Sequence, residues 1–274
     1  MKRFVMVCGD KGGTGKSLMT RALADHVRRE QYDALLIDGD GEVGNLFQFY
    51  AALDAHGEPV AEQVPDGVVP IRFTGPERER DQLLAAVDLG RPLILADMPA
   101  ASLTQLKQFD SDTGFFAELA RADYRATLVN VLSPFSASTR TVREMIELAG
   151  EQADYVVAIN QWFGDREDFF MWYGNATCSA SPGRTMLAES GGIEIALSKL
   201  QAGVLVAIDE LLLTFSAARE DTRLTTPQRS RLHRWMQAVD ANSTRPPSIW
   251  GWRRSRHEQR GLRPTALAAR ARRS

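Results

Sequence analysis

The sequence has little cysteine and no long apolar run, and both absences exclude classes of protein. Only two of its 274 residues are cysteine, too few for a disulfide framework or a cysteine-ligated metal site. The four histidines are scattered without the spacing of metal ligands. No run of about 18 apolar residues occurs, so no transmembrane helix is expected. These features predict a globular protein of the reducing cytoplasm.

Lysine is scarce as well, and its distribution is uneven. Of the 33 basic residues only five are lysine, and two of these, Lys11 and Lys16, lie within one seven-residue stretch. In a chain that otherwise uses arginine for positive charge, this placement indicates a chemical role for the two lysines.

Charge is divided unequally along the chain. Residues 245–274 contain nine arginines and one glutamate, a charge of +8, so the other 244 residues carry −10 of the total of −2. Past Asn242 the composition shifts to arginine, proline, serine and alanine, which is typical of a segment without a packed core. We therefore expect one large domain over residues 1–242 and a basic, arginine-rich tail over residues 243–274.

Apolar runs of strand length alternate with segments of helical periodicity. We predict strands at residues 3–8, 33–37, 68–73, 92–96, 125–132, 154–159 and 193–197. We predict helices at residues 17–29, 76–87, 139–149, 199–217 and 226–239. This alternation implies βαβ units, so the expected fold class is α/β, with a mostly parallel, twisted sheet and helices on both faces.

A glycine-rich segment joins the first predicted strand to the first predicted helix. It reads Lys11-Gly12-Gly13-Thr14-Gly15-Lys16-Ser17. Glycines let consecutive backbone N–H groups face phosphate oxygens. We expect Lys16 to reach the β- and γ-phosphates and the Ser17 hydroxyl to ligate Mg²⁺, with Leu18 next in the nucleotide-binding segment. The sequence therefore predicts a P-loop NTPase fold with ATP and Mg²⁺ as cofactors.

The phosphate loop departs from the general pattern, because Asp10 stands where that pattern has a glycine. The stretch instead resembles the deviant Walker A motif, Lys-Gly-Gly-x-Gly-Lys-Ser/Thr, of the ParA/MinD family of ATPases, and the resemblance extends over roughly residues 1–215. It implies an ATP-dependent homodimer in which Lys11 reaches the nucleotide of the partner subunit. A second cation there would stabilise charge on the transferring phosphoryl group, which makes Lys11 a catalytic candidate beside Lys16.

Acidic residues follow two further predicted strands. Asp38-Gly39-Asp40, followed by Asn45, resembles the second motif of the same family, which implies that Asp40 positions the attacking water and Asp38 supports the Mg²⁺ site. Asp97 resembles a Walker B residue that holds Mg²⁺ through a water. A solvated acidic turn and a helix-capping aspartate are the alternatives for these positions.

Asn160 directly follows the strand predicted at residues 154–159. By the same resemblance it reads the adenine edge, since an amide donates and accepts hydrogen bonds at once. A turn asparagine is the alternative interpretation. The aromatic run at residues 169–173 fits either the core or a partner surface.

These motifs lead to one functional hypothesis and two alternatives. The hypothesis is an ATP-hydrolysing dimerisation switch, slow until a protein partner stimulates it, that acts in plasmid or cargo partition, positioning or conjugal transfer. The arginine-rich tail would then contact DNA; a segment that binds a partner protein and a solvated, disordered tail are the alternatives. A membrane contact is less favoured because residues 262–271 have little apolar bulk. The alternatives are an accessory nucleotide-binding protein of a conjugation or secretion machine with little turnover, and a metabolic P-loop enzyme.

Overall fold

The computed structural model describes residues 1–9, 11–243 and 247–250 of the chain. Its centre is a seven-stranded sheet with the strand order β3-β2-β4-β1-β5-β6-β7. Every pairing between neighbouring strands is parallel, which confirms the predicted α/β class. The strands are β1 (Lys2–Cys8), β2 (Ala34–Asp38), β3 (Val68–Pro70), β4 (Leu93–Asp97), β5 (Tyr124–Leu132), β6 (Ala153–Asn160) and β7 (Ile193–Leu197).

Side chains of the strands alternate between two buried clusters, one on each face of the sheet. On β1, Val5 and Val7 belong to one cluster, whereas Phe4 and Met6 belong to the other. This alternation follows from the two-residue period of a strand. Burial on both faces is also the reason why the strands are continuous apolar runs in the sequence.

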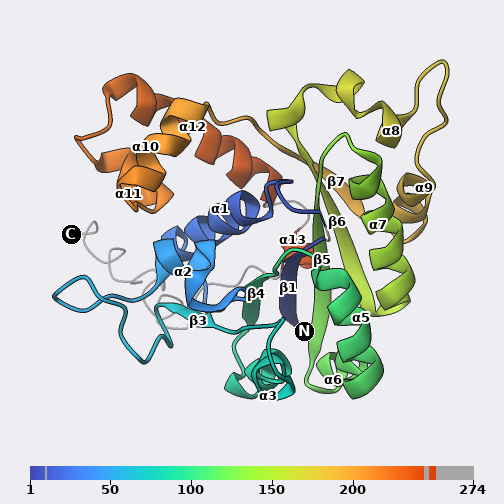
Figure 1. Cartoon of the computed structure of the whole chain (residues 1–274), viewed down its shortest axis with the longest axis horizontal. Coiled ribbons are helices and arrows are strands. Elements are labelled where there is room, and N and C mark those ends of the chain that lie inside the picture. Colours follow the sequence, from blue (N-terminus) through green and yellow to red (C-terminus); the bar gives the residue numbers. More distant parts are fainter. Residues whose placement is uncertain (10, 244–246, 251–274) are drawn as a thin grey trace, which may run out of the picture.

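Helices cover both faces of the sheet, as predicted (Figure 1). The first face carries α1 (Lys16–Arg29), α2 (Asn45–Tyr50), α10 (Ala202–Glu210), α11 (Phe215–Glu220), α12 (Thr226–Ser243) and α13 (Pro247–Trp250). The second carries α4 (Gln82–Ala85), α5 (Ser102–Thr113), α6 (Phe115–Arg121), α7 (Ser136–Ala149), α8 (Phe170–Tyr173) and α9 (Pro182–Glu189).

Strand β1 lies at the point where the chain connections diverge. The chain leaves β1 through α1 on the first face and reaches β2, on the β4 side of β1. After β4 it crosses through α5 and α6 on the second face and enters β5, on the other side of β1. Ligands of open α/β sheets bind at such a switch point, beyond the carboxyl ends of the strands. The glycine-rich segment after β1 lies there.

Three predicted elements are wrong in extent. The strand expected at 68–73 ends at Pro70, and the helix expected at 76–87 is divided into α3 (Glu77–Arg80), α4 and a 3₁₀ turn, η2 (Ala86–Leu89). The helix expected at 199–217 is two helices, because Leu212 between them has a left-handed backbone with φ of 49°. Helices α5 and α6 were not predicted, although Leu103, Leu106 and Phe109 are spaced for one helix face.

Packing continues beyond the domain end that was predicted after residue 242. Helix α12 extends to Ser243, and α13 follows. Within α13, Trp250 is fully buried and Ile249 is 7% exposed, and the backbone oxygen of Ile249 accepts a hydrogen bond from Thr127 Oγ1 of β5 at 2.6 Å. The part of the chain that packs therefore includes Trp250, and the remaining predicted tail, residues 251–274, lies outside the described residues.

Within the ranges that the structure describes, no helix combines the length and the apolar character needed to cross a bilayer.

Candidate functional site

The segment between β1 and α1 forms a turn that depends on glycine. Gly13 and Gly15 have φ values of 72° and 101°, in the left-handed region that glycine adopts at little cost. Lys11, Gly12 and Gly13 are exposed, and Gly15 directly precedes α1 as its N-cap. Backbone N–H groups at a helix N-terminus attract anions, so this geometry fits a phosphate-binding loop.

Lys16 begins α1 and is 8% exposed. Its Nζ donates a hydrogen bond to the backbone oxygen of Lys11 at 2.9 Å, so the ammonium group lies across the loop. Lys11 itself is exposed, with Nζ 5.4 Å from the ring centre of Phe135, the residue that precedes α7. The two lysines of the motif thus occupy different environments, one inside the loop and one on its outer side.

Asp97 ends β4 and meets α1 below the loop. The hydroxyl of Thr20 lies 2.7 Å from Asp97 Oδ1, and the Ser17 hydroxyl also bonds this carboxylate. Burial raises the pKa of the Asp97 carboxyl to about 7, against the effect of these two hydrogen bonds, and the charge of Asp38 raises it further. A buried carboxylate beside a serine hydroxyl has the ligand chemistry that Mg²⁺ prefers, so Ser17 and Asp97 fit a magnesium site.

Asp38 ends β2 and is enclosed by its own chain. Its two carboxylate oxygens accept hydrogen bonds from the backbone N–H groups of Asp40, at 3.0 Å, and Phe47, at 2.9 Å. Burial raises the pKa of Asp38, and these backbone hydrogen bonds oppose the rise. A Cβ at Gly44 would lie 1.9 Å from Asp38 Oδ1, so the segment closes around the carboxylate only with glycine there. The contacts of Asp38 hold residues 38–47 in place.

Asp40, by contrast, is exposed and precedes the 3₁₀ turn η1 (Gly41–Val43). Desolvation by neighbouring groups raises the pKa of its carboxyl, and the positive charge of Lys16 opposes this. The carboxylate therefore lies within electrostatic reach of the loop lysine while it faces solvent. Such a group is able to orient a water molecule.

Asn160 ends β6 and lies beneath the phosphate loop, 3% exposed. Its Nδ2 donates to the backbone oxygen of Thr14 at 2.7 Å, and its Oδ1 accepts from the backbone N–H of Trp162 at 3.0 Å. Adenine reading by Asn160 stays a prediction; the contacts present join the loop to the 3₁₀ turn η4 (Gln161–Phe163).

The structure thus brings most of the predicted site residues to one edge of the sheet. Asp38 and Asp97 are register partners on β2 and β4, and Asp97 is also the partner of Val7 on β1. Leu18 is partly buried against the first cluster, which makes it a packing residue of α1. Within the described residues, no group of three or more His, Cys, Asp or Glu side chains could hold a metal.

Three residues near the candidate site, Thr20, Trp162 and Lys199, were not predicted from the sequence. Thr20 was not singled out, yet its position one turn after Lys16 places it on the same helix face, which was a usable signal. Trp162 is 40% exposed beside Asn160, with Lys199 Nζ 5.5 Å from its ring centre. No local pattern in the sequence indicated that Trp162 and Lys199 would meet.

The aromatic run at residues 169–173 belongs mainly to the core. Phe169 and Trp172 are fully buried in the second cluster, and Phe170 is 43% exposed. The buried members therefore favour the core interpretation of this run.

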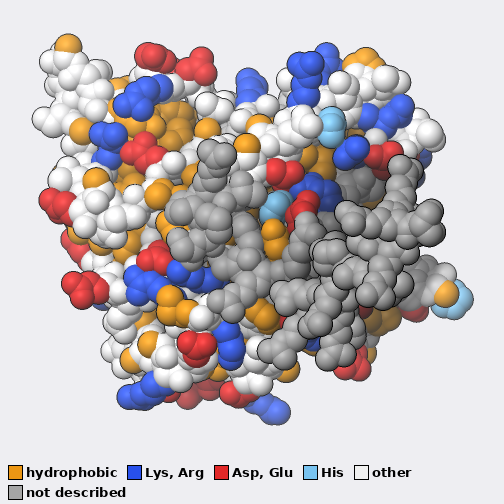
Figure 2. Space-filling view, turned by 180° about the vertical axis from the view of Figure 1, so that it is seen from behind, with side chains coloured by type: hydrophobic (Ala, Val, Ile, Leu, Met, Phe, Trp, Pro, Cys, Tyr) orange, Lys and Arg blue, Asp and Glu red, His pale blue; other side chains and the backbone are white. Residues whose placement is uncertain are grey.

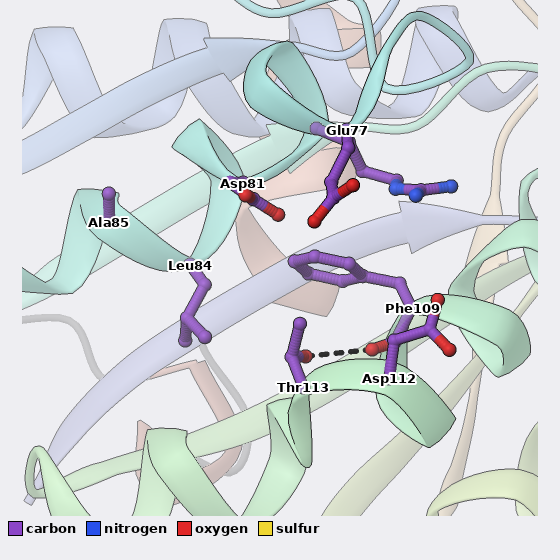
Figure 3. A pocket seen from close by; sticks show the side chains of 8 residues that line it. Glu77, Asp81, Leu84, Ala85, Phe109, Asp112 and Thr113 are labelled. Atoms are coloured by element: carbon purple, nitrogen blue, oxygen red, sulfur yellow. Dashed lines mark hydrogen bonds between the residues drawn. The ribbon is translucent and has the colours of Figure 1, made fainter.

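A hollow lies away from the loop, between α3, α4 and α5 (Figure 3). It measures about 630 Å³, and the ring of Phe109 lies beneath the carboxylates of Glu77 and Asp81. Asp112 adds a third carboxylate to its lining. Arg80 also lines the hollow, so three carboxylates face one guanidinium and the lining has a net negative charge, which disfavours a triphosphate.

No family model and no curated protein matches the sequence. Solved structures with a similar fold include the septum site-determining protein MinD complexed with Mg-ADP from Pyrococcus horikoshii OT3, at 15% identity, with 88% of this chain and 96% of that chain covered and a TM-score of 0.47. A putative plasmid partition protein from Borrelia burgdorferi B31 bound to AMPPNP has 14% identity, coverage of 88% and 99%, and a TM-score of 0.46. Apo McdA from Cyanthece has 14% identity, coverage of 88% and 99%, and a TM-score of 0.49. The similarity concerns the fold.

Proposed function

We propose that the chain binds MgATP at residues 11–17 and hydrolyses it as a switch for homodimer formation. The observation that carries this proposal is the convergence of Lys16, Ser17, Asp40 and Asp97 around one glycine-dependent loop at the switch point of the sheet. Each of these side chains has a task in phosphoryl transfer that suits its position.

Lys16 and the loop N–H groups would hold the phosphate oxygens, and Ser17 and Asp97 would hold the metal. Mg²⁺, when bound, would neutralise part of the phosphate charge. Asp40 is exposed and electrostatically linked to Lys16, so it would orient the attacking water. Asp38 would act indirectly, since its backbone hydrogen bonds fix the segment that carries Asp40.

Dimer formation is proposed from Lys11. Its side chain is exposed on the outer side of the loop, where a second protomer has access to it. The resemblance of the motif to the deviant Walker A form supports the same assignment. ATP shared between two such loops would join the protomers, and hydrolysis would release them.

Three lysine variants test the switch. We expect wild-type protein to dimerise with ATP and Mg²⁺ and to hydrolyse ATP. Lys16→Ala should lose nucleotide binding, whereas Lys11→Ala should keep it and lose both dimer formation and turnover. Lys107→Ala, an exposed lysine on α5, is the matched control. Light scattering and phosphate release report the two activities; a Lys11→Ala protein that dimerises and turns over like wild type would rule out the shared-nucleotide dimer.

Turnover separates this proposal from the accessory-protein alternative. Tight ATP binding with negligible phosphate release, in the presence and absence of DNA, would favour ATP as a structural ligand. Measurable turnover that a partner protein accelerates would favour the switch, in which the cycle serves partition, positioning or conjugal transfer.

DNA contact is proposed for the arginine-rich residues 251–274. Where the grey atoms leave the surface visible in Figure 2, basic and acidic side chains of the described residues are interspersed. Because Ile249 and Trp250 pack in the core, the informative deletion begins at residue 251. We expect that deletion to abolish ATP-dependent DNA binding without loss of folding; binding that persists unchanged would assign DNA contact elsewhere.

A further inference from the structure

The amide of Asn160 is fixed in one orientation by its surroundings. One end of the side chain faces the carbonyl oxygen of Thr14, and the other faces the backbone N–H of Trp162. Only the NH₂ end can meet a carbonyl and only the oxygen end can meet an N–H group. The two neighbours therefore determine which end is which, and a flipped amide would place oxygen against oxygen and nitrogen against nitrogen.

Because Asn160 and Thr14 are buried, the loss of either hydrogen bond would be costly. Asn160 is 3% exposed and Thr14 is 4% exposed, so water has little access to replace a lost bond. A buried polar group left without a partner bears its full desolvation cost. The approach is also close, since a Cβ at Gly15 would lie 2.5 Å from Asn160 Nδ2. Gly15 is thus required both by its left-handed backbone and by the presence of Asn160.

The bond to Thr14 sets the direction of the next peptide group. Across a planar trans peptide, the carbonyl of one residue and the N–H of the next point in opposite directions. Because the Thr14 oxygen points to Asn160, the Gly15 N–H points away from β6. This N–H belongs to the segment whose backbone donors would hold phosphate.

We propose that Asn160 is a positioning residue of the phosphate loop, which orients the Thr14–Gly15 peptide for phosphate binding whatever base the nucleotide carries. This inference rests on the proposed nucleotide site. It is distinct from the adenine-reading role that the motif resemblance implied, because the two hydrogen bonds that the amide makes here both go to the chain itself. Through Trp162, the same side chain couples the loop to η4.

Binding measurements with three magnesium-loaded ligands separate the two roles. ATP, GTP and inorganic tripolyphosphate share the phosphates and differ in the base. Asn160→Ala should weaken all three by a similar factor, roughly tenfold, the usual effect of one lost hydrogen bond. Asn160→Leu, which keeps the branched shape but not the hydrogen bonds, should do the same if the alanine variant folds poorly. Asn175→Ala is the matched control, since Asn175 is exposed and its side-chain oxygen accepts hydrogen bonds from Thr177 and Cys178 in its own turn.

A ligand-free readout accompanies the binding series. The amide resonance of Gly15 in the full chain should shift in Asn160→Ala, because the preceding carbonyl loses its hydrogen bond, and it should stay in place in Asn175→Ala. Weaker ATP binding with unchanged GTP and tripolyphosphate binding, or an unmoved Gly15 resonance, would overturn the proposal. Wild-type protein that binds none of the three ligands would instead refute the nucleotide site itself.

Discussion

The hydroxyl of Thr20 lies 2.7 Å from Oδ1 of Asp97 and joins α1 to the end of β4. The same hydroxyl lies 3.1 Å from the backbone oxygen of Lys16, one helical turn earlier. A hydroxyl has one proton, and the shorter contact assigns it to the carboxylate. Thr20 thus holds the acid that we propose for the metal site, and it does so from the helix that begins with Lys16.

Replacement of Thr20 tests this link. Thr20→Val keeps the shape of the side chain and removes the donor, so the carboxylate of Asp97, which is only 5% exposed, loses a partner. We expect a loss of about 2 kcal/mol in the free energy of unfolding, measured by urea titration. Thr20→Ser keeps the hydroxyl and should recover most of that loss. Equal stability of the valine and wild-type proteins would show that the contact contributes nothing.

Asp154 predicts a pH dependence of stability. Burial alone would raise the pKa of its carboxyl, but hydrogen bonds from Arg125 and Arg3 outweigh burial and hold the pKa below the ordinary 3.8. A lowered pKa stabilises the fold above the unfolded-state value, and this contribution is lost as the pH falls through the folded-state value.

Asp154→Asn should therefore cost about 3 kcal/mol at pH 7, because buried Arg3 loses its counter-charge. The difference from wild type should shrink as the pH is lowered below 3.8. Urea unfolding at several pH values measures it. Glu118→Gln, which breaks an exposed pair with Arg121, is the control and should cost less than about 0.5 kcal/mol. A pH-independent difference would contradict the assignment.

Gly44 predicts a steric effect on the proposed water-positioning segment. Its φ of −71° suits any residue, so the obstacle to alanine is steric: the carboxylate of Asp38 lies 1.9 Å from the added Cβ. Gly44→Ala should destabilise the fold by about 2 kcal/mol and lower the rate of phosphate release. Gly203→Ala, in α10 with no atom within 4 Å of its added Cβ, should be neutral or stabilising. Similar effects of the two changes would argue against a specific clash.

The burial of Trp250 indicates that the packed part of the chain extends at least to this residue. It is fully buried, and Trp250→Ala should cost about 4 kcal/mol, as for other large core aromatics. Trp162→Ala, at a side chain that is 40% exposed, should cost much less. Thermal unfolding of both variants and of a chain that ends after Trp250 measures the difference. A truncated chain as unstable as Trp250→Ala would show that later residues are also needed.

Features with local sequence causes were predictable. The apolar runs predicted the parallel sheet, and the glycine-rich residues 11–17 predicted the turn from β1 into α1. The position of Asp97 at the end of β4 could also be predicted from the sequence, because a polar residue that ends an apolar run falls at the ligand-binding edge of the sheet. These signals depend on neighbours in the sequence and on the two-residue and 3.6-residue periods.

Features that depend on register between distant segments were not predictable. The contact of Asn160 with Thr14 spans 146 residues, and that of Thr127 with Ile249 spans 122. Each requires the position of a strand or helix in three dimensions, which no local pattern contains. The basic composition after residue 242 likewise concealed Trp250, because one buried tryptophan carries no periodic signal.

Asp38 ends β2 and Asp40 follows it, and the different surroundings of this segment's residues have a consequence for how such a chain can diverge. Asp38 and Gly44 are locked together, so a change at either disturbs the whole turn. Glu42 and Val43 are exposed on that same turn, and Val43 is 78% exposed. Mutation can therefore change the partner contacts at these two positions while Asp38 and Gly44 keep the segment that carries Asp40 in place. We therefore expect related chains to keep Asp38 and Gly44 and to differ at Glu42 and Val43.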